Sequence, residues 1–310
     1  MSESSSHYGI VVGVDGSPQS DAAVAWAAHE AGMRGTRLTL VHALTDPTAA
    51  AWLDVPLPAE YWEAQRARAT VLLEDATRIA QQELPTDTPV TVDRHVASDS
   101  PRAVLVDLSK DAEMVVVGCR GFGAIQRALL GSVSSGLVRH AHCPVAVVHN
   151  DDIHDDDIHD DDIHDDDPTR DRPADAPVVV GIDGSPASDR AVQIAFDEAS
   201  RRGVDLVALH TWLESTDDFI DVGWPNVSER AEEILGERLA GWQERYPDVT
   251  VRRMVKMNNP VHELLDLSES AQLLVVGSHG RGGIAGLVLG SVSSAVVQGA
   301  RIPVIVARQS

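Results

Sequence analysis

Short apolar runs alternate with longer amphipathic segments along most of the chain. The runs are rich in Val, Ile and Leu and predict strands, whereas the segments between them have helical length and one apolar face. Such alternation is typical of βαβ units and a parallel sheet. In the first half the predicted strands are Gly9–Val14, Arg37–Ala43, Pro89–Val96, Glu113–Gly118 and Pro144–His149. The predicted helices are Pro18–Met33, Glu60–Glu83, Pro101–Lys110 and Ser132–Ala141.

The same pattern is written twice in the sequence. The stretch Ile10–Ala31 recurs as Val178–Ala199, and Val115–Val138 recurs as Leu274–Val297. A repeat of this length predicts two copies of one domain. We therefore expect an α/β protein with two tandem, doubly wound, five-stranded parallel sheets that carry helices on both faces. The predicted domains are residues 1–150 and 176–310, joined by a linker over residues 151–175.

The linker is strongly acidic. It holds 13 Asp and two Arg, a net charge of −11 out of −23 for the whole chain. Its few apolar residues cannot offset the entropy of ordering, and its like charges repel, so it predicts an extended spacer. The alternative is metal binding through His154, His159 and His164, which lie among carboxylates.

Composition narrows the classes of function. Aromatic residues make up only 4% of the chain, so the core must be aliphatic. The acidity disfavours nucleic acid or a membrane surface as a partner, since both are anionic. Cys119 and Cys143 are the only cysteines, and neither a secretory signal nor a membrane-length apolar run is present. We expect a reduced, cytoplasmic protein.

A glycine motif occurs once in each copy, after the predicted fourth strand. Gly118, Gly121 and Gly131 match Gly277, Gly280 and Gly290, and the last glycine opens a helix in both cases. Glycines let main-chain N–H groups approach an anion, and a helix N-terminus adds free donors and a favourable dipole. The motif predicts two phosphate-binding sites. For Ser135 and Ser294, capping of the helix is at least as good an interpretation as phosphate contact.

An aspartate follows the first strand of each copy. Asp15 and Asp183 come two residues after Gly13 and Gly181, at the edge where ligands bind in doubly wound sheets. Each carboxylate is predicted either to bind a ribose hydroxyl or an adenine edge, or to form an Asx-turn that starts the next helix.

The histidines favour structural interpretations. His42 and His210 end the second strand of each copy and are predicted to be satisfied core residues. The segment His140–Cys143 has metal-ligating residue types but no counterpart in the second copy, so a metal role is not favoured.

On these motifs the chain resembles the universal stress proteins of the tandem type. The resemblance implies the strand order 3-2-1-4-5 in a fold like that of the adenine-nucleotide α-hydrolases and phosphate binding by the glycine motif. It also implies adenine contact by the backbone just past the second strand, at Ala43 and Thr211. Arg120 and Arg281 are candidates for charge near the phosphates. The first-half candidates are Gly13, Asp15, Ala43, Gly118, Arg120, Gly121, Gly123, Gly131, Ser132, Val133 and Ser134. Those of the second half are Gly181, Asp183, Thr211, Gly277, Gly280, Arg281, Gly283, Gly290, Ser291, Val292 and Ser293.

The resemblance implies a stress-response protein that binds one ATP in each domain and acts as a regulator rather than an enzyme. Mg²⁺ can accompany the ATP, and Asp15 and Asp183 are the candidate ligands for this ion. The alternatives are a slow ATPase, a phosphoryl or nucleotidyl transferase, and a protein that binds cyclic AMP. The resemblance also predicts that the two domains pair through their fifth strands, with homodimers as a further expectation. Cys119 departs from the serine that is commoner in the family.

Overall fold

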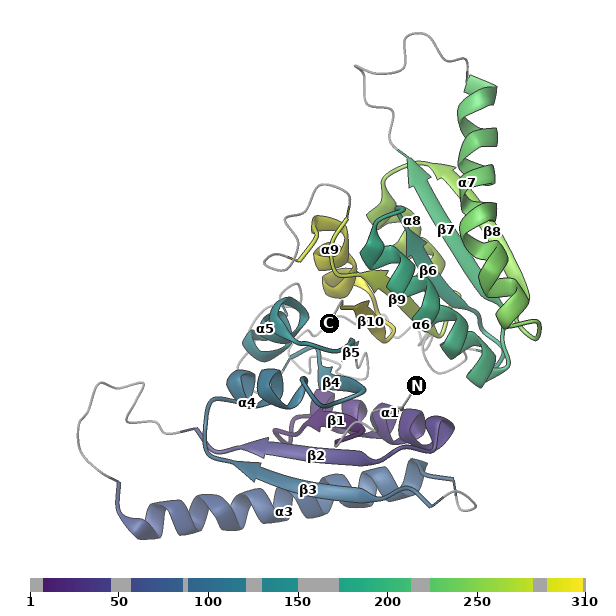
Figure 1. The fold of residues 1–310 in the computed structure, drawn as a ribbon. Helices are drawn as coiled ribbons and strands as arrows, with labels where there is room; N and C mark the ends of the chain where they lie inside the picture. The colour runs from purple at the N-terminus through teal and green to yellow at the C-terminus, as the bar shows by residue number, and fades with distance from the viewer. Residues whose placement is uncertain are drawn as a thin grey trace, which may run out of the picture. The chain divides into compact units, whose positions relative to one another are not determined.

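The first half of the chain folds as an α/β unit. The computed structural model describes residues 8–45, 57–85, 89–120, 130–149, 173–212, 224–280 and 289–308. These residues form two compact units, which largely correspond to the two copies in the sequence. The first half contains, in chain order, β1 (Ile10–Gly13), α1 (Pro18–Arg34), β2 (Leu38–Ala43), α3 (Ala59–Glu83), β3 (Val92–Ala97), α4 (Pro101–Leu108), β4 (Met114–Gly118), α5 (Ser132–His140) and β5 (Val145–Val148) (Figure 1).

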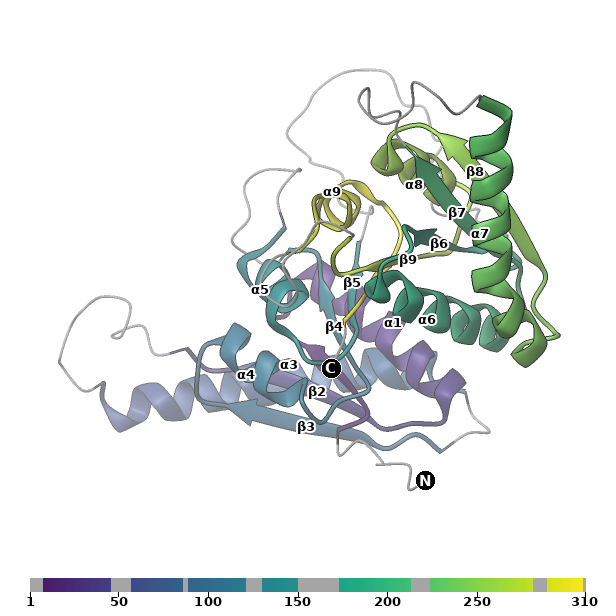
Figure 2. The ribbon, with the colours of Figure 1, turned by 45° about the horizontal axis from the view of Figure 1, so that its top comes forward.

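The second half repeats this order of elements. It contains β6 (Val178–Ile182), α6 (Pro186–Arg202), β7 (Leu206–Trp212), α7 (Trp224–Arg245), β8 (Val251–Met257), α8 (Pro260–Ser268), β9 (Leu273–Gly277), α9 (Ser291–Gly299) and β10 (Val304–Ala307) (Figure 2). The predicted fold class, with strands and helices alternating in both copies, is confirmed.

Strand pairing confirms the order 3-2-1-4-5 in each half. In the first half β1 lies between β2 and β4, and β3 and β5 lie outside them. In the second half β6 lies between β7 and β9, with β8 and β10 outside, and the pairs whose register is defined are parallel. The first three strands are added towards one edge of the sheet, and the fourth and fifth are added towards the other edge. A crevice therefore opens between the carboxyl ends of the first and fourth strands.

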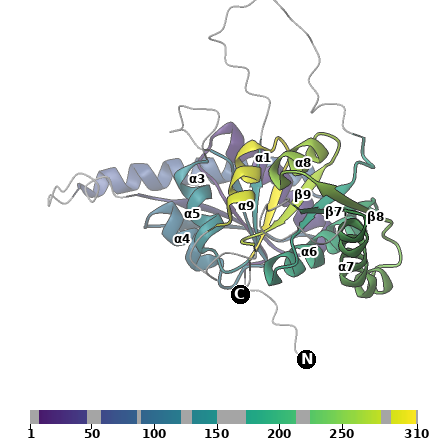
Figure 3. The ribbon, with the colours of Figure 1, turned by 90° about the horizontal axis from the view of Figure 1, so that it is seen from above.

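Each sheet carries helices on both faces. In the second half β7 and β9 lie between α8 and α9 on one side and α6 and α7 on the other (Figure 3). In the first half α1 packs against α3, and α4 against α5. The central strands are aliphatic and buried along almost their whole length, as in β1 and β4. The core is therefore built from the aliphatic residues that the composition required.

Local signals set the ends of the elements. Ser17 caps α1, since its hydroxyl accepts from the Ser20 N–H, and Pro18 occupies the first turn as predicted. Gly35 and Gly203 end α1 and α6 in the left-handed conformation. The third strand begins at Val92 instead of Pro89, because a proline has no N–H to give to a ladder. The acidic repeat, residues 151–167, lies outside the described residues, so both of its interpretations remain predictions.

Candidate functional site

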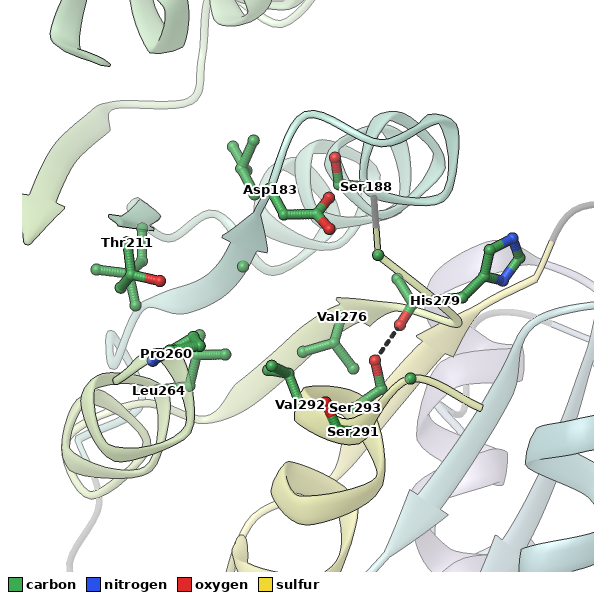
Figure 4. Close-up of a pocket in the computed structure, with 16 residues that line it drawn as sticks. Asp183, Ser188, Thr211, Pro260, Leu264, Val276, His279, Ser291, Val292 and Ser293 are labelled. Atoms are coloured by element: carbon green, nitrogen blue, oxygen red, sulfur yellow. Dashed lines mark hydrogen bonds between the residues drawn. The ribbon is translucent and has the colours of Figure 1, made fainter. Parts of the chain in front are cut away.

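A pocket opens at the carboxyl edge of the second sheet, where the order of strands reverses. Its volume is about 200 Å³, far more than the roughly 15 Å³ that one water needs. The lining comes from β6, β7, β9, the loop after β9, and the first turns of α6, α8 and α9 (Figure 4). The residues are Gly181, Ile182, Asp183, Ser188, Leu209, Thr211, Pro260, Leu264, Val276, Gly277, His279, Gly280, Gly290, Ser291, Val292 and Ser293.

The start of α9 offers unused main-chain donors to this pocket. Its N-cap is Gly290, which has no side chain with which to cap the helix. The first hydrogen bond of the helix joins the Ser294 N–H to Gly290 O, at 2.9 Å. The N–H groups of residues 291–293 have no partner within the helix and none elsewhere in the part of the chain that is described. An anion there would meet three donors and the positive end of the helix dipole.

The first half repeats this uncapped helix start. Gly131 is the N-cap of α5, and the Ser135 N–H donates to Gly131 O at 2.9 Å. By contrast, α1, α4, α6 and α8 each begin with a side chain that accepts from the first turn. Both glycine motifs therefore lead into a helix without a side-chain cap, a feature that α3, whose N-cap is Pro58, also has.

The glycines that end β4 and β9 are explained by packing. A β-carbon at Gly118 would lie 2.8 Å from the main-chain carbonyl carbon of Gln19. At Gly277 it would lie 3.0 Å from the same atom of Ala187. The first helix of each half thus crosses the end of the fourth strand at a distance that only glycine permits. Close packing is thus a second reason for glycine at these two positions, and Gly277 also lines the pocket, so their role at an anion stays a prediction.

Serine side chains near the helix start hold the glycine loop together. The Ser293 hydroxyl donates to Gly277 O at 2.5 Å, and the Ser134 hydroxyl donates to Cys119 O at 3.0 Å. Gly290 N–H and Gly131 N–H close the same loops on Ser278 O and Cys119 O, each at 2.8 Å. Ser134 and Ser293 are buried, and their hydroxyl hydrogens are committed to main-chain carbonyls. At Ser134 and Ser293, the main-chain N–H is therefore the donor that remains available to a ligand.

The two aspartates both form the predicted Asx-turn, whereas their contact with a ribose or an adenine stays a prediction. Asp183 Oδ1 accepts from the Ser185 N–H at 2.9 Å, which is an Asx-turn. Asp15 Oδ1 accepts from the Ser17 N–H at 2.9 Å and from its hydroxyl at 2.6 Å. The second oxygen of Asp183 lies close to Gly280 in the pocket lining. A β-carbon on Gly280 would lie only 2.6 Å from this oxygen. One carboxylate therefore shapes the turn with one oxygen and faces the glycine loop with the other.

The opposite end of the pocket is mainly apolar. Leu209 comes from β7, Pro260 and Leu264 from α8, and Val276 from β9. The Thr211 hydroxyl points into this end of the pocket (Figure 4). Apolar walls with a few polar groups are typical of sites that bind the flat ring of a small molecule.

The strand-end histidines have structural partners. His42 Nδ1 lies 2.7 Å from Val14 O, and His210 Nδ1 lies 2.7 Å from Ile182 O. Each imidazole thus ties the second strand to the end of the first, as predicted. Across the described ranges, no group of three potential His, Cys, Asp or Glu metal ligands occurs. Cys143 is buried, and burial raises the pKa of its thiol to about 12.

The pocket brings together most of the residues predicted for the second half. Nine of them line it: Gly181, Asp183, Thr211, Gly277, Gly280, Gly290, Ser291, Val292 and Ser293. Gly121, Gly123, Arg281 and Gly283 lie outside the described residues. In the first half, the described candidates occupy the equivalent strand ends and helix start, which are β1, β2, β4 and α5.

Sequence reasoning missed the apolar part of the lining. Ile182, Leu209, Pro260, Leu264 and Val276 were not predicted. The proline after the third strand is a usable signal, because Pro101 and Pro260 repeat in the two copies and start α4 and α8. The three aliphatic strand residues could not be told from the core by pattern alone.

Charge near the first turn of the first helix differs between the halves. In the first half burial, then Asp15 and Asp75, raise the pKa of Asp21 above its usual value. In the second half Asp189 instead accepts from Arg238 at 2.7 Å, and Arg238 also donates to Gly184 O at 3.1 Å. The loop that carries Asp183 is thus held by an arginine, and Asp21 has no equivalent arginine partner among the residues that the structure describes.

This difference predicts opposite effects from one substitution. A raised pKa means that ionised Asp21 opposes folding, so Asp21→Asn should stabilise the first half by about 0.2–0.5 kcal/mol at neutral pH. The gain should disappear as the pH falls towards the pKa that Asp21 has in the unfolded chain, since the carboxyl is then protonated in both the folded and the unfolded state. Asp189→Asn, which loses its arginine, should destabilise the second half by about 0.2–1 kcal/mol. Denaturant unfolding at pH 7 and pH 4 measures both; equal signs at pH 7 would contradict the assignment.

Fold and pocket define a doubly wound α/β protein in tandem, with a ligand crevice at the carboxyl edge of the sheet. The family model described as the universal stress protein family matches residues 9–149 and again residues 176–308. The chain therefore belongs to the universal stress protein family. Within the described residues, no helix is long and apolar enough to cross a membrane.

Known relatives match this chain over almost its whole length. The universal stress protein Rv2623 of Mycobacterium tuberculosis (strain H37Rv) is 49% identical over 311 residues, which cover 100% of this chain and 99% of the relative. A universal stress protein of Mycolicibacterium smegmatis is 47% identical over 310 residues, covering 99% of each. A crystal structure of a universal stress protein from Archaeoglobus fulgidus matches with a TM-score of 0.68 and 18% identity, over 97% of this chain and 98% of that one. The last comparison concerns the fold.

Proposed function

We propose that each half of the chain binds one ATP at the carboxyl edge of its sheet, and that the protein acts in the stress response as a nucleotide-dependent regulator. The observation that carries this proposal is the uncapped helix start, with three free N–H groups, at one end of a partly apolar pocket. A strongly acidic chain can attract a polyphosphate only through such a local, main-chain site.

The order of groups across the sheet supports a nucleoside triphosphate. Thr211 lies on β7, Asp183 follows β6, and the helix start lies beyond β9. Neighbouring strands are about 4.8 Å apart, so the apolar end and the phosphate end are separated by roughly 10 Å. That is the span of a nucleoside. Base, ribose and phosphates would then lie over β7, β6 and β9 in turn, with the free oxygen of Asp183 facing the ribose.

We propose binding without efficient turnover. Among the described lining residues, Asp183 and His279 are the acidic and imidazole side chains, and Asp183 is engaged in a turn. Phosphoryl transfer requires a placed nucleophile as well as positioning. Direct titration of the purified chain with ATP should give two equivalents per chain, and ATP should persist when Mg²⁺ is added. A lack of binding, or turnover well above background, would contradict this function. Pairing of the domains through their fifth strands, and of two chains, stays a prediction.

The ribose contact can be tested without disturbing the turn. In Asp15→Asn plus Asp183→Asn, each amide oxygen can still accept the turn hydrogen bond, while the other oxygen becomes an N–H₂ donor. Hydrogen bonds to charged groups contribute about 1.5–3 kcal/mol, so the affinity for ATP should fall roughly ten- to a hundredfold. The affinity for 2′,3′-dideoxy-ATP, which lacks the hydroxyls, should barely change. Equal losses for both nucleotides would remove the ribose assignment.

A further inference from the structure

The side chain of Thr211 has an uncommitted hydroxyl inside the pocket. Thr211 is half-buried, and its oxygen points into the apolar end (Figure 4). It has no hydrogen-bond partner among the described residues, whereas the Ser188 and Ser293 hydroxyls in the same pocket donate to main-chain carbonyls at 2.8 and 2.5 Å. A partly buried polar group without a partner carries a cost in free energy that a ligand can remove.

The first half has no hydroxyl at this position. Gly13 pairs with Val41 as Gly181 pairs with Leu209, so Ala43 is the register equivalent of Thr211. The neighbouring edge strand differs too, since Ala43 pairs with Ala97 and Thr211 pairs with Lys256. Paired residues of a parallel sheet lie side by side on one face. The second half therefore has a hydroxyl and an ammonium where the first has two methyl groups.

We propose that the Thr211 hydroxyl adds to the base specificity of the second half, by a hydrogen bond to the polar substituent at C6 of a purine, and that the first half lacks this contribution. The inference rests on the proposed nucleotide-binding function. A hydroxyl both donates and accepts. It can therefore pair with the amine of adenine or the carbonyl of guanine, but a purine with hydrogen at C6 leaves it unsatisfied. The apolar walls around it, Leu209 and Leu264, offer no substitute.

The test compares ATP with purine riboside 5′-triphosphate, which lacks the C6 amine. Ser132→Glu, an exposed substitution that places a carboxylate at the helix start of the first half, isolates the second site. In this background ATP should bind roughly three- to tenfold more tightly than the analogue, the range of one net hydrogen bond. Thr211→Val, which keeps the shape and removes the hydroxyl, should lower the ATP affinity by that factor and bring the ratio of the two affinities down to that of the first site. An unchanged ratio in Thr211→Val would overturn the proposal.

Two controls separate the hydroxyl from other causes. Lys256→Ala removes the neighbouring charge, and it should leave the ratio of the two affinities unchanged; a shift equal to that of Thr211→Val would overturn the proposal. In the reciprocal Ser291→Glu background, the first site with its Ala43 should show a smaller preference for ATP than the second site, by about that factor. The same preference there would also overturn the proposal, because no hydroxyl could be its source. If ATP fails to bind both in the Ser132→Glu background and in the Ser291→Glu background, the nucleotide-binding function itself is rejected.

Discussion

Glutamate at both Ser132 and Ser291 should abolish ATP binding while both halves stay folded. Each serine is exposed at the first position of an uncapped helix, so the new side chain has room. Its carboxylate lies at the free N–H groups and repels an incoming polyphosphate. Like charges brought together at a binding site cost several kcal/mol, which corresponds to a loss of at least roughly a hundredfold in affinity. The helix itself should gain slightly, because a negative charge is favourable at its N-terminus. Titration calorimetry measures the binding, and thermal unfolding checks the fold.

Glutamine at the same two positions is the matched control. It has the size of glutamate without the charge, so it should retain most of the affinity. The single glutamate variants should each leave one equivalent of ATP per chain. Strong ATP binding by the double glutamate variant would show that the phosphates bind elsewhere, and would contradict phosphate binding at the starts of α5 and α9.

The glycines that end β4 and β9 are poorer probes of binding. Alanine at Gly118 or Gly277 would push its β-carbon against the main chain of the first helix of that half. Main chain cannot rotate away as a side chain can, so a loss of stability would accompany any loss of binding. The helix-start serines separate the two effects, because their side chains are exposed.

The fold was predictable because several independent signals agree at each element. The Ser-Pro pairs at Ser17 and Ser185 mark where α1 and α6 begin, and the glycines at Gly35 and Gly203 mark where they end. Repetition of the whole pattern in two copies made the alternation of strands and helices unambiguous. The strand order came from the family resemblance, since alternation alone does not say which strands are neighbours.

The candidate site was predictable only where glycine or a charged residue marks it. Gly290 and Asp183 stand out in a sequence, whereas Leu264 and Val276 look like any core residue until the sheet brings them together. The reason for Gly277 was also hidden, because the close approach of α6 is a tertiary contact. The partner choice of each hydroxyl, which distinguishes Thr211 from Ser293, requires atomic positions.

Arg202→Met should lower the free energy of unfolding of the second half by about 3–5 kcal/mol. Arg202 lies at the end of α6 and pairs with Glu198 at 3.3 Å, with side-chain exposures of 8% and 0%. It also donates to Gln272 Oε1 at 3.2 Å, and Gln272 donates to Ala176 O at 2.6 Å. In sequence this is an ordinary i,i+4 pair, worth about 0.3–0.5 kcal/mol on a surface. Burial changes the magnitude, because removal of the guanidinium leaves a carboxylate in a site of low polarity.

Replacement of both partners separates a favourable pair from a penalty for isolated charge. In Glu198→Met plus Arg202→Met no ionised group remains at the pair, so the double variant should recover most of the stability lost in Arg202→Met. Arg34→Met breaks the equivalent pair with Glu30 in the first half, where the exposures are 15% and 0%. Its effect should be smaller, since Arg34 is the more exposed arginine. Denaturant unfolding followed by circular dichroism measures all three variants. A double variant as unstable as Arg202→Met would show that the pair itself stabilises the end of α6, and that loss of the cation beside a buried carboxylate is not the source of the effect.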